Sequence, residues 1–249
     1  MLNYFQALKE ESLTRTTLLK VGTWIAVVVI LTATLCYFLI AVRIEQQTLK
    51  RLENYVTERG QRENEIFALA KDNHALLKTV LMEQLQSPFN IDPNSAFDYL
   101  FQRDRDGVTR NRPERFDGTK QSCVYIGKSL PITDEIKRQV LFFYQLTTQY
   151  GMAWQNRFVD TYIITPENLV VLYWPSNSKW CNNADAHLNL LEEEFFWVSD
   201  KQHDPARTTT WTGVYYDHVA KKWLVSGITP IDLQGQHIAS LGHDIELNQ

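Results

Sequence analysis

The chain has 249 residues, of which 44% are hydrophobic and 22% are charged, and its formal net charge is −4. This composition fits one or two globular units and excludes a disordered or fibrous chain. The basic residues are scattered and do not gather on one element, so the charge pattern gives no indication of a nucleic-acid partner.

The first distinctive segment lies near the N-terminus, where residues 21–42 carry no formal charge and are bounded by Lys20 and Arg43. As a helix at ~1.5 Å per residue, this run spans roughly 33 Å, enough to cross a hydrocarbon core about 30 Å thick. A signal peptide is the alternative, because a basic tail precedes the run. The run is too long for a typical signal core, however, and ends in large residues and not at a small-residue cleavage site. We therefore expect a cytoplasmic tail at 1–20 and an uncleaved transmembrane helix at 21–43.

Charge does not fix the orientation of this span, because basic residues flank both of its ends: Lys9, Arg15 and Lys20 before it, and Arg43, Lys50, Arg51 and Arg59 after it. Cys36 lies inside the span, which leaves Cys123 and Cys181 as the one pair elsewhere. A disulfide in an oxidising compartment and two buried thiols are both compatible with this pair. The cysteines and the folded region that follows the span favour an orientation in which residues 44–249 are extracytoplasmic.

Residues 44–86 have the composition of a long helix, rich in Glu, Gln, Lys, Arg and Leu and free of proline, with Leu49, Leu52 and Val56 at helical spacing. Such a helix cannot bury a core alone, so it must pack on a domain or on a second copy of itself. The second option predicts a homodimer. A passive stalk and a signalling rod fit the pattern equally well. Residues unfavourable to helix end the segment: Pro88, Asn90, Asp92 and Pro93.

Residues 87–249 combine helical and strand-like patterns. A helix is predicted at 133–155, a hairpin at 160–175 with its turn at 166–168, and a further helix at 183–199. Three β-rich runs complete the chain: Thr210–Asp217, Trp223–Ile231 and Gln236–Ile245. This order predicts an α+β fold, in which an antiparallel sheet is flanked by helices and follows the transmembrane and long helices.

Two of these strands carry a candidate binding surface. Because successive side chains of a strand point to opposite faces, Trp211, Gly213, Tyr215 and Asp217 are expected to share one face. In the last strand, Asp244 follows a glycine in the same alternation. Two carboxylates beside aromatic side chains would receive an ammonium group by charge-assisted hydrogen bonds and cation–π attraction. The alternative is that an Asp at a strand end serves only the turn, and that aromatic residues are simply frequent in strands.

Three short motifs near the C-terminus add to this interpretation: Tyr215-Tyr216-Asp217, Thr229-Pro230-Ile231 and Gly242-His243-Asp244-Ile245. Together they resemble the end of the membrane-distal module of a double Cache (dCache) sensor, the PAS-like extracytoplasmic region of bacterial chemoreceptors, histidine kinases and diguanylate cyclases. The resemblance extends from about residue 22 to the C-terminus. In amino-acid-binding members, it implies that positions matching Tyr215, Asp217 and Asp244 receive the ligand's amino group.

The sequence departs from that family in two respects. The Arg-x-Trp-Tyr segment that holds a ligand carboxylate is absent, and Arg207 is the candidate substitute. An amino acid, an amine and another small polar molecule are therefore all open as ligands. Trp174, Trp180 and Trp197 are open as pocket or core residues. A second Cache module, a second membrane span and an output domain are also absent, so we expect a fragment of a larger histidine kinase or diguanylate cyclase.

Two alternatives belong to other functional classes. A membrane-anchored hydrolase would draw on the six histidines, but no phosphate-loop, nucleophile or metal-ligand motif accompanies them, and we predict no enzyme activity, metal or cofactor. A coiled-coil scaffold or partner-binding module would explain residues 44–86, but not the Tyr and Asp pattern. The prediction is thus a small-molecule sensor in the bacterial plasma (inner) membrane, in contact with lipid, with these candidate ligand-binding residues: Trp174, Arg207, Trp211, Tyr215, Asp217 and Asp244.

Overall fold

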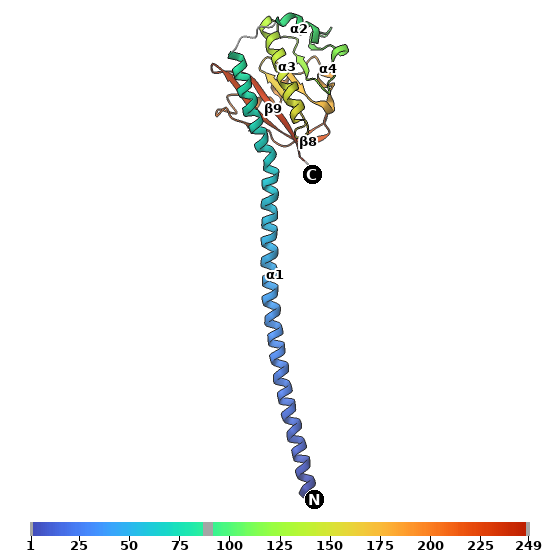
Figure 1. The fold of residues 1–249 in the computed structure, drawn as a ribbon, viewed down its shortest axis with the longest axis vertical. Coiled ribbons are helices and arrows are strands. Elements are labelled where there is room, and N and C mark those ends of the chain that lie inside the picture. The colour runs from blue at the N-terminus through green and yellow to red at the C-terminus, as the bar shows by residue number, and fades with distance from the viewer. Residues whose placement is uncertain (1, 87–91, 248–249) are drawn as a thin grey trace. The chain divides into compact units, whose positions relative to one another are not determined.

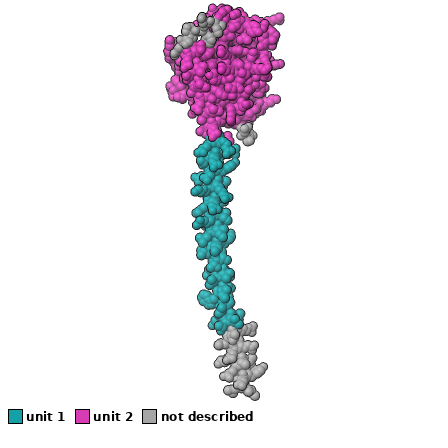
Figure 2. Space-filling model, in the orientation of Figure 1, with its two compact units in different colours: residues 1–62 teal, residues 63–249 magenta. Residues whose placement is uncertain are grey.

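A computed structural model describes residues 2–86 and 92–247 of the chain (Figure 1). By internal contacts the chain divides into two compact units, residues 1–62 and residues 63–249 (Figure 2). The predicted helix-ending residues Pro88 and Asn90 lie outside the described residues. The domain boundary placed at residue 87 from the sequence stays a prediction.

The first unit is helical and belongs to helix α1, Leu2–Gln86. Among the described residues, α1 is the one helix that is long and apolar enough to cross a membrane, judged by length and composition. The large apolar side chains of the predicted span are exposed, including Trp24 and Leu31. The helix continues without a break through Gly60 and the polar stretch around it.

The second unit contains the last turns of α1 and the following helices: α2 Pro93–Leu100, α3 Asp134–Trp154, α4 Trp180–Asn183 and α5 Glu194–Trp197. Short 3-10 turns lie at Pro113–Arg115, Pro175–Asn177 and Leu190–Glu192. Its strands are β1 Phe101–Arg103, β2 Thr109–Asn111, β3 Cys123–Ile126, β4 Thr161–Thr165, β5 Leu169–Tyr173, β6 Thr210–Trp211, β7 Tyr215–Asp217, β8 Lys222–Leu233 and β9 Gln236–Glu246.

These strands form one antiparallel sheet in the order β1-β2-β3-β5-β4-β9-β8-β6, and β7 pairs with β8 as well. Neighbouring strands can be far apart in the chain: Tyr162 of β4 pairs with Gly242 of β9. The predicted α+β fold, with an antiparallel sheet and flanking helices, is confirmed. The predicted hairpin is also present as β4 and β5, with Asn168 in the left-handed conformation at its turn.

Side-chain alternation gives the sheet two buried faces. On one face, aliphatic residues of the central strands, such as Ile163 and Leu241, pack against α3 and against Leu77 and Leu81 of α1. On the other face, residues such as Tyr162 pack against the connection between β5 and β6, which we call the insert and define as residues 174–209. The two faces are therefore covered by different parts of the chain.

Three details of the sequence prediction are corrected or settled. The helix predicted at 183–199 is wrong, because Asp185 and Asn189 use their side chains to cap nearby backbone amides, and only short turns form. The strand predicted at 210–217 is also wrong, since it divides into β6 and β7. The two cysteines, which the sequence left open, form a disulfide between Cys123 of β3 and Cys181 of α4.

Candidate ligand-binding site

A small cavity lies between the insert and the sheet face that the insert covers. Its volume is about 70 Å³. The residues that line it come from β4 and the residue before it, from β5, β7 and β9, and from the insert: Asp160, Tyr162, Ile164, Val170, Leu172, Trp174, Trp180, Leu190, Phe195, Tyr215, Asp217 and Asp244.

Three neighbouring carboxylates line this cavity. Asp160 precedes β4, Asp217 ends β7, and Asp244 lies in β9 beside the start of β4. Asp160 and Asp244 are buried, with 5% and 7% of their surface exposed. The backbone N–H of Asp244 donates to Oδ1 of Asp160 at 3.2 Å. Within residues 16–86 and 92–247, no basic side chain forms an ion pair with any of the three.

Hydroxyl groups orient the carboxylate of Asp244. Ser226 donates to its Oδ1 at 2.6 Å, and Tyr162 donates to the same oxygen at 3.3 Å. The hydroxyl of Tyr215 lies 3.4 Å from Oδ2 and 2.8 Å from the hydroxyl of Ser226. Because these donors are neutral, they fix the direction of the carboxylate and leave its charge without a cation to balance it.

Burial makes the ionised form of these carboxylates costly. Desolvation raises the pKa of Asp244 to about 6, against the lowering effect of the Ser226 hydrogen bond. Desolvation also raises the pKa of Asp160 well above its ordinary value, and the neighbouring Asp244 adds to the rise. Burial likewise raises the pKa of Tyr162 and of Tyr215, so both phenols keep their protons. A cation that entered here would relieve the repulsion between the two carboxylates.

Asp217 has a second role beside the cavity. Its Oδ1 accepts hydrogen bonds from the backbone N–H groups of Val219 and Ala220, at 2.7 Å and 2.6 Å, and so caps the turn between β7 and β8. The turn role that the sequence left open is therefore real, and it coexists with a position on the cavity wall. A carboxylate has a second oxygen that the turn does not use.

Apolar and aromatic side chains form the rest of the wall. Trp174 is 6% exposed, and its indole N–H has no hydrogen-bond partner among the described atoms. Trp180 lies in α4, next to Cys181 and its disulfide to β3. The lining thus combines three carboxylates with apolar and aromatic side chains.

Two of the candidate residues chosen from the sequence do not line this cavity. Trp211 lies on the opposite face of the sheet, where its ring packs edge-on to Phe67 of α1 at 4.9 Å and covers Gly227. The break between β6 and β7 is the reason, because it uncouples the alternation of Trp211 from that of Tyr215. Arg207 is paired with Asp232 through two hydrogen bonds of 2.6 Å and is not available to a ligand in the cavity.

The structure brings the other four candidates, Trp174, Tyr215, Asp217 and Asp244, to one cavity and adds two residues that sequence reasoning missed. These are Asp160 and Tyr162, which alternate with Ile164 at the beginning of the hairpin. The signal in the sequence was the same pattern of carboxylate and aromatic residue that drew attention to Tyr215 and Asp217. Trp197 does not line the cavity; it packs against His203 at 4.7 Å.

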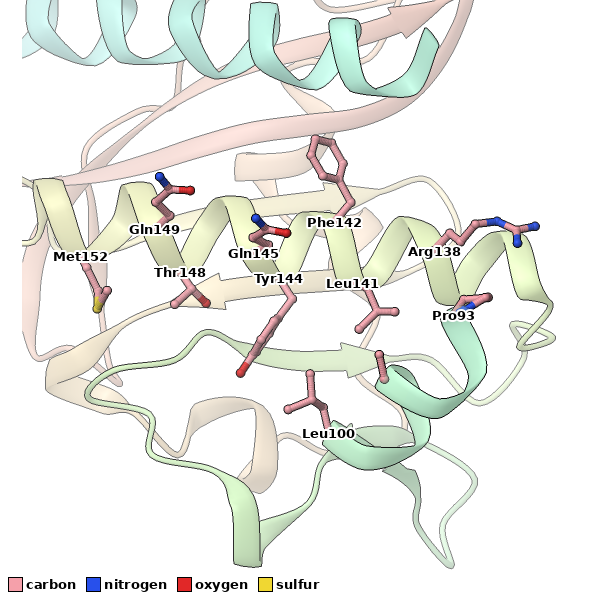
Figure 3. A pocket seen from close by; sticks show the side chains of 11 residues that line it. Pro93, Leu100, Arg138, Leu141, Phe142, Tyr144, Gln145, Thr148, Gln149 and Met152 are labelled. Atoms are coloured by element: carbon pink, nitrogen blue, oxygen red, sulfur yellow. The ribbon is translucent and has the colours of Figure 1, made fainter. Parts of the chain in front are cut away.

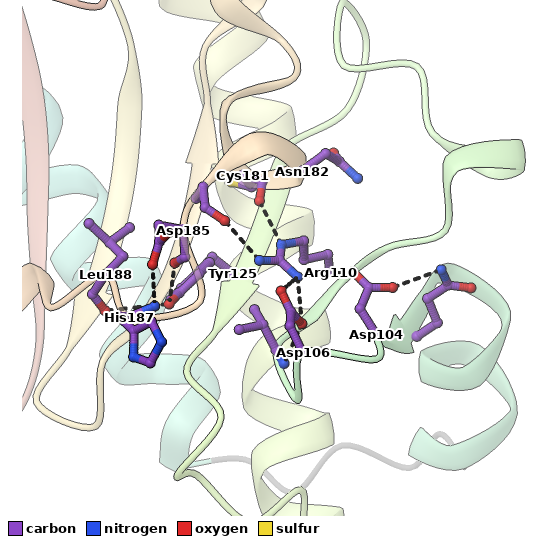
Figure 4. Close-up of polar contacts among 12 residues, drawn as sticks. Asp104, Asp106, Arg110, Tyr125, Cys181, Asn182, Asp185, His187 and Leu188 are labelled. Carbon is purple, nitrogen blue, oxygen red and sulfur yellow. Dashed lines mark hydrogen bonds and ion pairs between the residues drawn. The ribbon is translucent and has the colours of Figure 1, made fainter.

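Two further hollows occur in the second unit. An apolar groove of about 490 Å³ lies between α2 and α3, with Leu100, Leu141 and Tyr144 among the side chains directed into it (Figure 3). A wide polar depression lies beside Arg110, which is buried and pairs with Asp104 and Asp106 (Figure 4). Neither hollow brings together several carboxylates without a cation.

The chain matches no family model and no curated protein. Among solved structures, it is similar to the sensory domain of the Campylobacter jejuni chemoreceptor Tlp3, with 16% identity, a TM-score of 0.36, and coverage of 74% of this chain and 62% of that domain. It is also similar to the ligand-binding domain of the Pseudomonas fluorescens chemoreceptor CtaA in complex with L-serine, with 12% identity, a TM-score of 0.31, and coverage of 45% and 51%. A third match is the ligand-binding domain of the Pseudomonas aeruginosa chemoreceptor PctC in complex with GABA, with 12% identity, a TM-score of 0.29, and coverage of 47% and 48%.

The matched structures are thus sensory and ligand-binding domains of chemoreceptors, the class of protein that the C-terminal motifs of this chain also resemble. The chain spans about 62% of the length of the Tlp3 domain. At these identities and TM-scores, the ligands of the matched proteins do not transfer to this chain. The side chains of this chain itself decide which ligands its cavity can hold.

Proposed function

We propose that this chain is the sensing region of a membrane-bound receptor, and that it binds a small organic amine through Asp160, Asp217 and Asp244. The observation that carries this proposal is the meeting of three carboxylates at one cavity, with no ion-pair partner among the described residues. A protonated amine offers three N–H donors and one positive charge, which suits a cluster of carboxylate oxygens.

The walls favour an amine over an amino acid. An amino acid needs a cation or a set of donors for its carboxylate, as well as acceptors for its ammonium group. The residues found to line the cavity include no Lys or Arg, and Arg207 is already engaged by Asp232. The apolar side chains, among them Ile164 and Val170, instead suit a short hydrocarbon tail. The aromatic ring of Trp174 adds a surface that attracts a cation.

The disulfide and the apolar part of α1 support an extracytoplasmic location for the second unit. A disulfide between Cys123 and Cys181 is typical of an oxidising compartment. With α1 crossing the bacterial inner membrane, lipid would surround residues 21–43, and residues 44–249 would lie outside the cytoplasm. The output would belong to a receptor such as a histidine kinase or a diguanylate cyclase.

The proposal includes a homodimer through α1. Leu49, Leu52 and Val56 are spaced by three and four residues, and each is more than half exposed. A second copy of the helix would cover this apolar stripe. The amine would act as a signal if it bound one arrangement of the second unit more tightly than another, because a ligand with equal affinity for both arrangements shifts nothing.

The test is a calorimetric titration of the full chain in nanodiscs with propylamine, alanine and propionate. We expect propylamine to bind more tightly than alanine, and propionate not to bind. Asp244→Asn should weaken propylamine binding at least about 30-fold, because a buried ammonium would lose a charged partner. Asp98→Asn is the matched control: this carboxylate pairs with Lys137 away from the cavity, and its loss should leave binding unchanged.

Two results would count against the proposal. A tighter affinity for alanine than for propylamine would show that the site holds a carboxylate as well as an ammonium group. Equal behaviour of the wild type and Asp244→Asn toward propylamine would remove the acidic cavity as the binding site.

A further inference from the structure

Two histidines stack on the sheet face opposite the acidic cavity. His74 of α1 and His243 of β9 are both fully buried, and their ring centroids lie 4.7 Å apart with an interplanar angle of 29°. The other face of the His243 ring stacks on Phe158, at 4.3 Å and 8°. Trp154 of α3 contacts His243 edge-on at 5.3 Å. The contact thus joins α1, α3 and β9 through aromatic rings.

Hydrogen bonds hold one nitrogen of each ring and leave the other without a partner. Nδ1 of His74 lies 2.8 Å from the hydroxyl of Thr229 in β8. Nδ1 of His243 lies 3.1 Å from the hydroxyl of Thr161 and 3.2 Å from the carbonyl oxygen of Asp160. Both Nε2 atoms are buried and have no hydrogen-bond partner within the described residues. An apolar pair in the same place would avoid the free-energy cost of these unpaired atoms, so packing alone does not account for two histidines here.

Two consecutive residues of β9 connect the stack to the cavity. His243 and Asp244 are consecutive in β9, so their side chains point to opposite faces. Asp160 is tied to both: its carboxylate accepts a hydrogen bond from the backbone of Asp244, and its backbone carbonyl lies at Nδ1 of His243. A change in the spacing of Asp160 and Asp244 therefore moves a group that the His243 ring contacts.

We propose that the stack of His74 and His243 transmits occupancy of the acidic cavity to helix α1. This inference rests on the proposed function and assigns a route for its signal. An ammonium group between Asp160 and Asp244 would draw the two carboxylates toward itself, and the start of β4 and the end of β9 would follow. His243 would then shift against His74, and α1 would respond at this level of the helix.

The neighbouring contacts of α1 explain why the helix should move at His74. One and two turns further along, Leu77 and Leu81 pack into the hydrophobic core that α1 and α3 form with the sheet. A well-packed aliphatic contact resists displacement, because any gap loses contacts. The two imidazole rings each carry an unsatisfied Nε2 atom, and a displaced arrangement can offer those nitrogens a partner.

The experiment is hydrogen–deuterium exchange of the full chain in nanodiscs, with and without saturating propylamine, alongside calorimetric titration of the same samples. In the wild type, propylamine should change the protection of the amides at 66–85 in α1. His74→Phe and His243→Phe keep a stacked ring but remove the imidazole nitrogens. We expect both variants to bind propylamine within about 3-fold of the wild type and to lose at least about half of the change in α1.

His237→Phe is the matched control. This histidine also lies in β9 and also stacks on an aromatic ring, Phe196, but that ring belongs to the insert and not to α1. The control should keep both the affinity and the change in α1. If His74→Phe and His243→Phe bind propylamine and retain the full change in α1, the proposal is overturned. It is also overturned if propylamine binds the wild type without altering α1.

A second measurement keeps the two proposals distinguishable. If propylamine does not bind the wild type, the proposed function fails, and the route is tested without ligand by a double-mutant cycle between Asp244→Asn and His74→Phe. Coupling through His243 predicts that the shift in Tm of the double variant differs from the sum of the two single shifts. Additive shifts would overturn the route. If His243→Phe does not fold, His74→Phe alone carries both measurements.

Discussion

The backbone amide of Asp244 donates to the side chain of Asp160 at 3.2 Å, across a separation of 84 residues in the chain. This bond places two buried carboxyl groups side by side, where both cannot ionise without strong repulsion. Burial raises the pKa of Asp244 to about 6, and burial together with Asp244 raises the pKa of Asp160. Near and below pH 6, the pair therefore holds a proton that a bound ammonium group would displace.

The first prediction is that amine affinity increases with pH. A simple alkylamine stays protonated up to about pH 10, like a lysine side chain, so only the carboxyl groups change their charge over the range tested. Propylamine affinity should rise by up to about 10-fold per pH unit below pH 6, where Asp244 is protonated, and should rise less steeply above it as Asp244 ionises. Calorimetric titrations between about pH 5 and pH 8 check this. An affinity that is flat or falls across the range would show that no proton leaves the site on binding.

The second prediction concerns stability, where His243 and Asp244 act in opposite directions. Burial lowers the pKa of His243 to about 4, from an ordinary value of 6.5. Its contribution to stability is complete above pH 6.5 and is lost as the pH falls toward about 4. Between these values, His243 is protonated in the unfolded chain but stays neutral in the folded chain, which favours unfolding. Asp244 has a raised pKa of about 6 against an ordinary value of 3.8, so the folded chain binds its proton first and gains stability as the pH falls between these values.

The two effects partly cancel in the wild type, and single substitutions should separate them. From pH 7 to pH 5, Asp244→Asn should lose stability more steeply than the wild type, and His243→Phe should lose less, or gain. The full shift of His243 corresponds to a free energy on the order of 3 kcal/mol. Urea or thermal unfolding of the full chain at both pH values measures these slopes. Parallel slopes in all three proteins would contradict the burial of either group.

Much of this arrangement follows from patterns visible in the sequence. Helical spacing predicts α1 and α3, and alternation predicts β9, in which Asp244 and His243 point to opposite faces. The sequence also predicts that Tyr215 and Asp217 lie near Asp244. These successes share a cause, because each depends on periodicity within one element or on the tight connection between neighbouring strands.

The failures arise where a distant part of the chain decides the local structure. The hydroxyl of Thr212 accepts a hydrogen bond from the backbone of Ser226, and the amide of Gly213 donates to Glu194 of the insert. These contacts divide the predicted strand and place Trp211 on the other face. Asp160 was missed because only the pairing of β4 with β9 brings it to Asp244, and no local pattern predicts which distant strands become neighbours.

The third prediction tests the close approach of Tyr162 to Gly242. A Cβ atom at Gly242 would lie 2.1 Å from the tyrosine ring, which is buried and cannot swing away without disturbing the cavity. Gly242→Ala should therefore lower the free energy of unfolding by about 1–3 kcal/mol and should also weaken propylamine binding. Unfolding and titration of the same sample measure both effects.

Gly213→Ala provides the comparison for this substitution. A Cβ atom there meets only the side chain of Glu194, at 3.8 Å, which is ordinary contact. In this variant, the free energy of unfolding and the affinity for propylamine should stay close to those of the wild type. If Gly242→Ala is as stable as Gly213→Ala, Tyr162 does not occupy the position described.

The fourth prediction concerns the anchoring of the insert, whose residues close one side of the cavity. The disulfide fixes Cys181, the neighbour of Trp180, to β3. Arg110 holds the same segment a second time, because it donates to the carbonyl oxygens of Cys181 and Ala184 at 3.0 Å and 2.8 Å (Figure 4). Replacing both Cys123 and Cys181 by serine removes the first anchor and keeps the second.

We expect the double variant to fold with a free energy of unfolding lower by about 2–4 kcal/mol. Without the disulfide, the unfolded chain regains the conformational entropy that closing the loop between residues 123 and 181 had removed. Propylamine affinity should fall by about 3- to 10-fold, since Trp180 would then be positioned without the disulfide, by contacts such as those of Arg110 and Asn182, and weaker positioning costs binding free energy. Cys36→Ser is the control, because this exposed thiol lies in the apolar segment of α1 and takes no part in the disulfide. An unchanged affinity in the double variant, together with reduced stability, would show that the disulfide stabilises the fold without shaping the wall of the cavity.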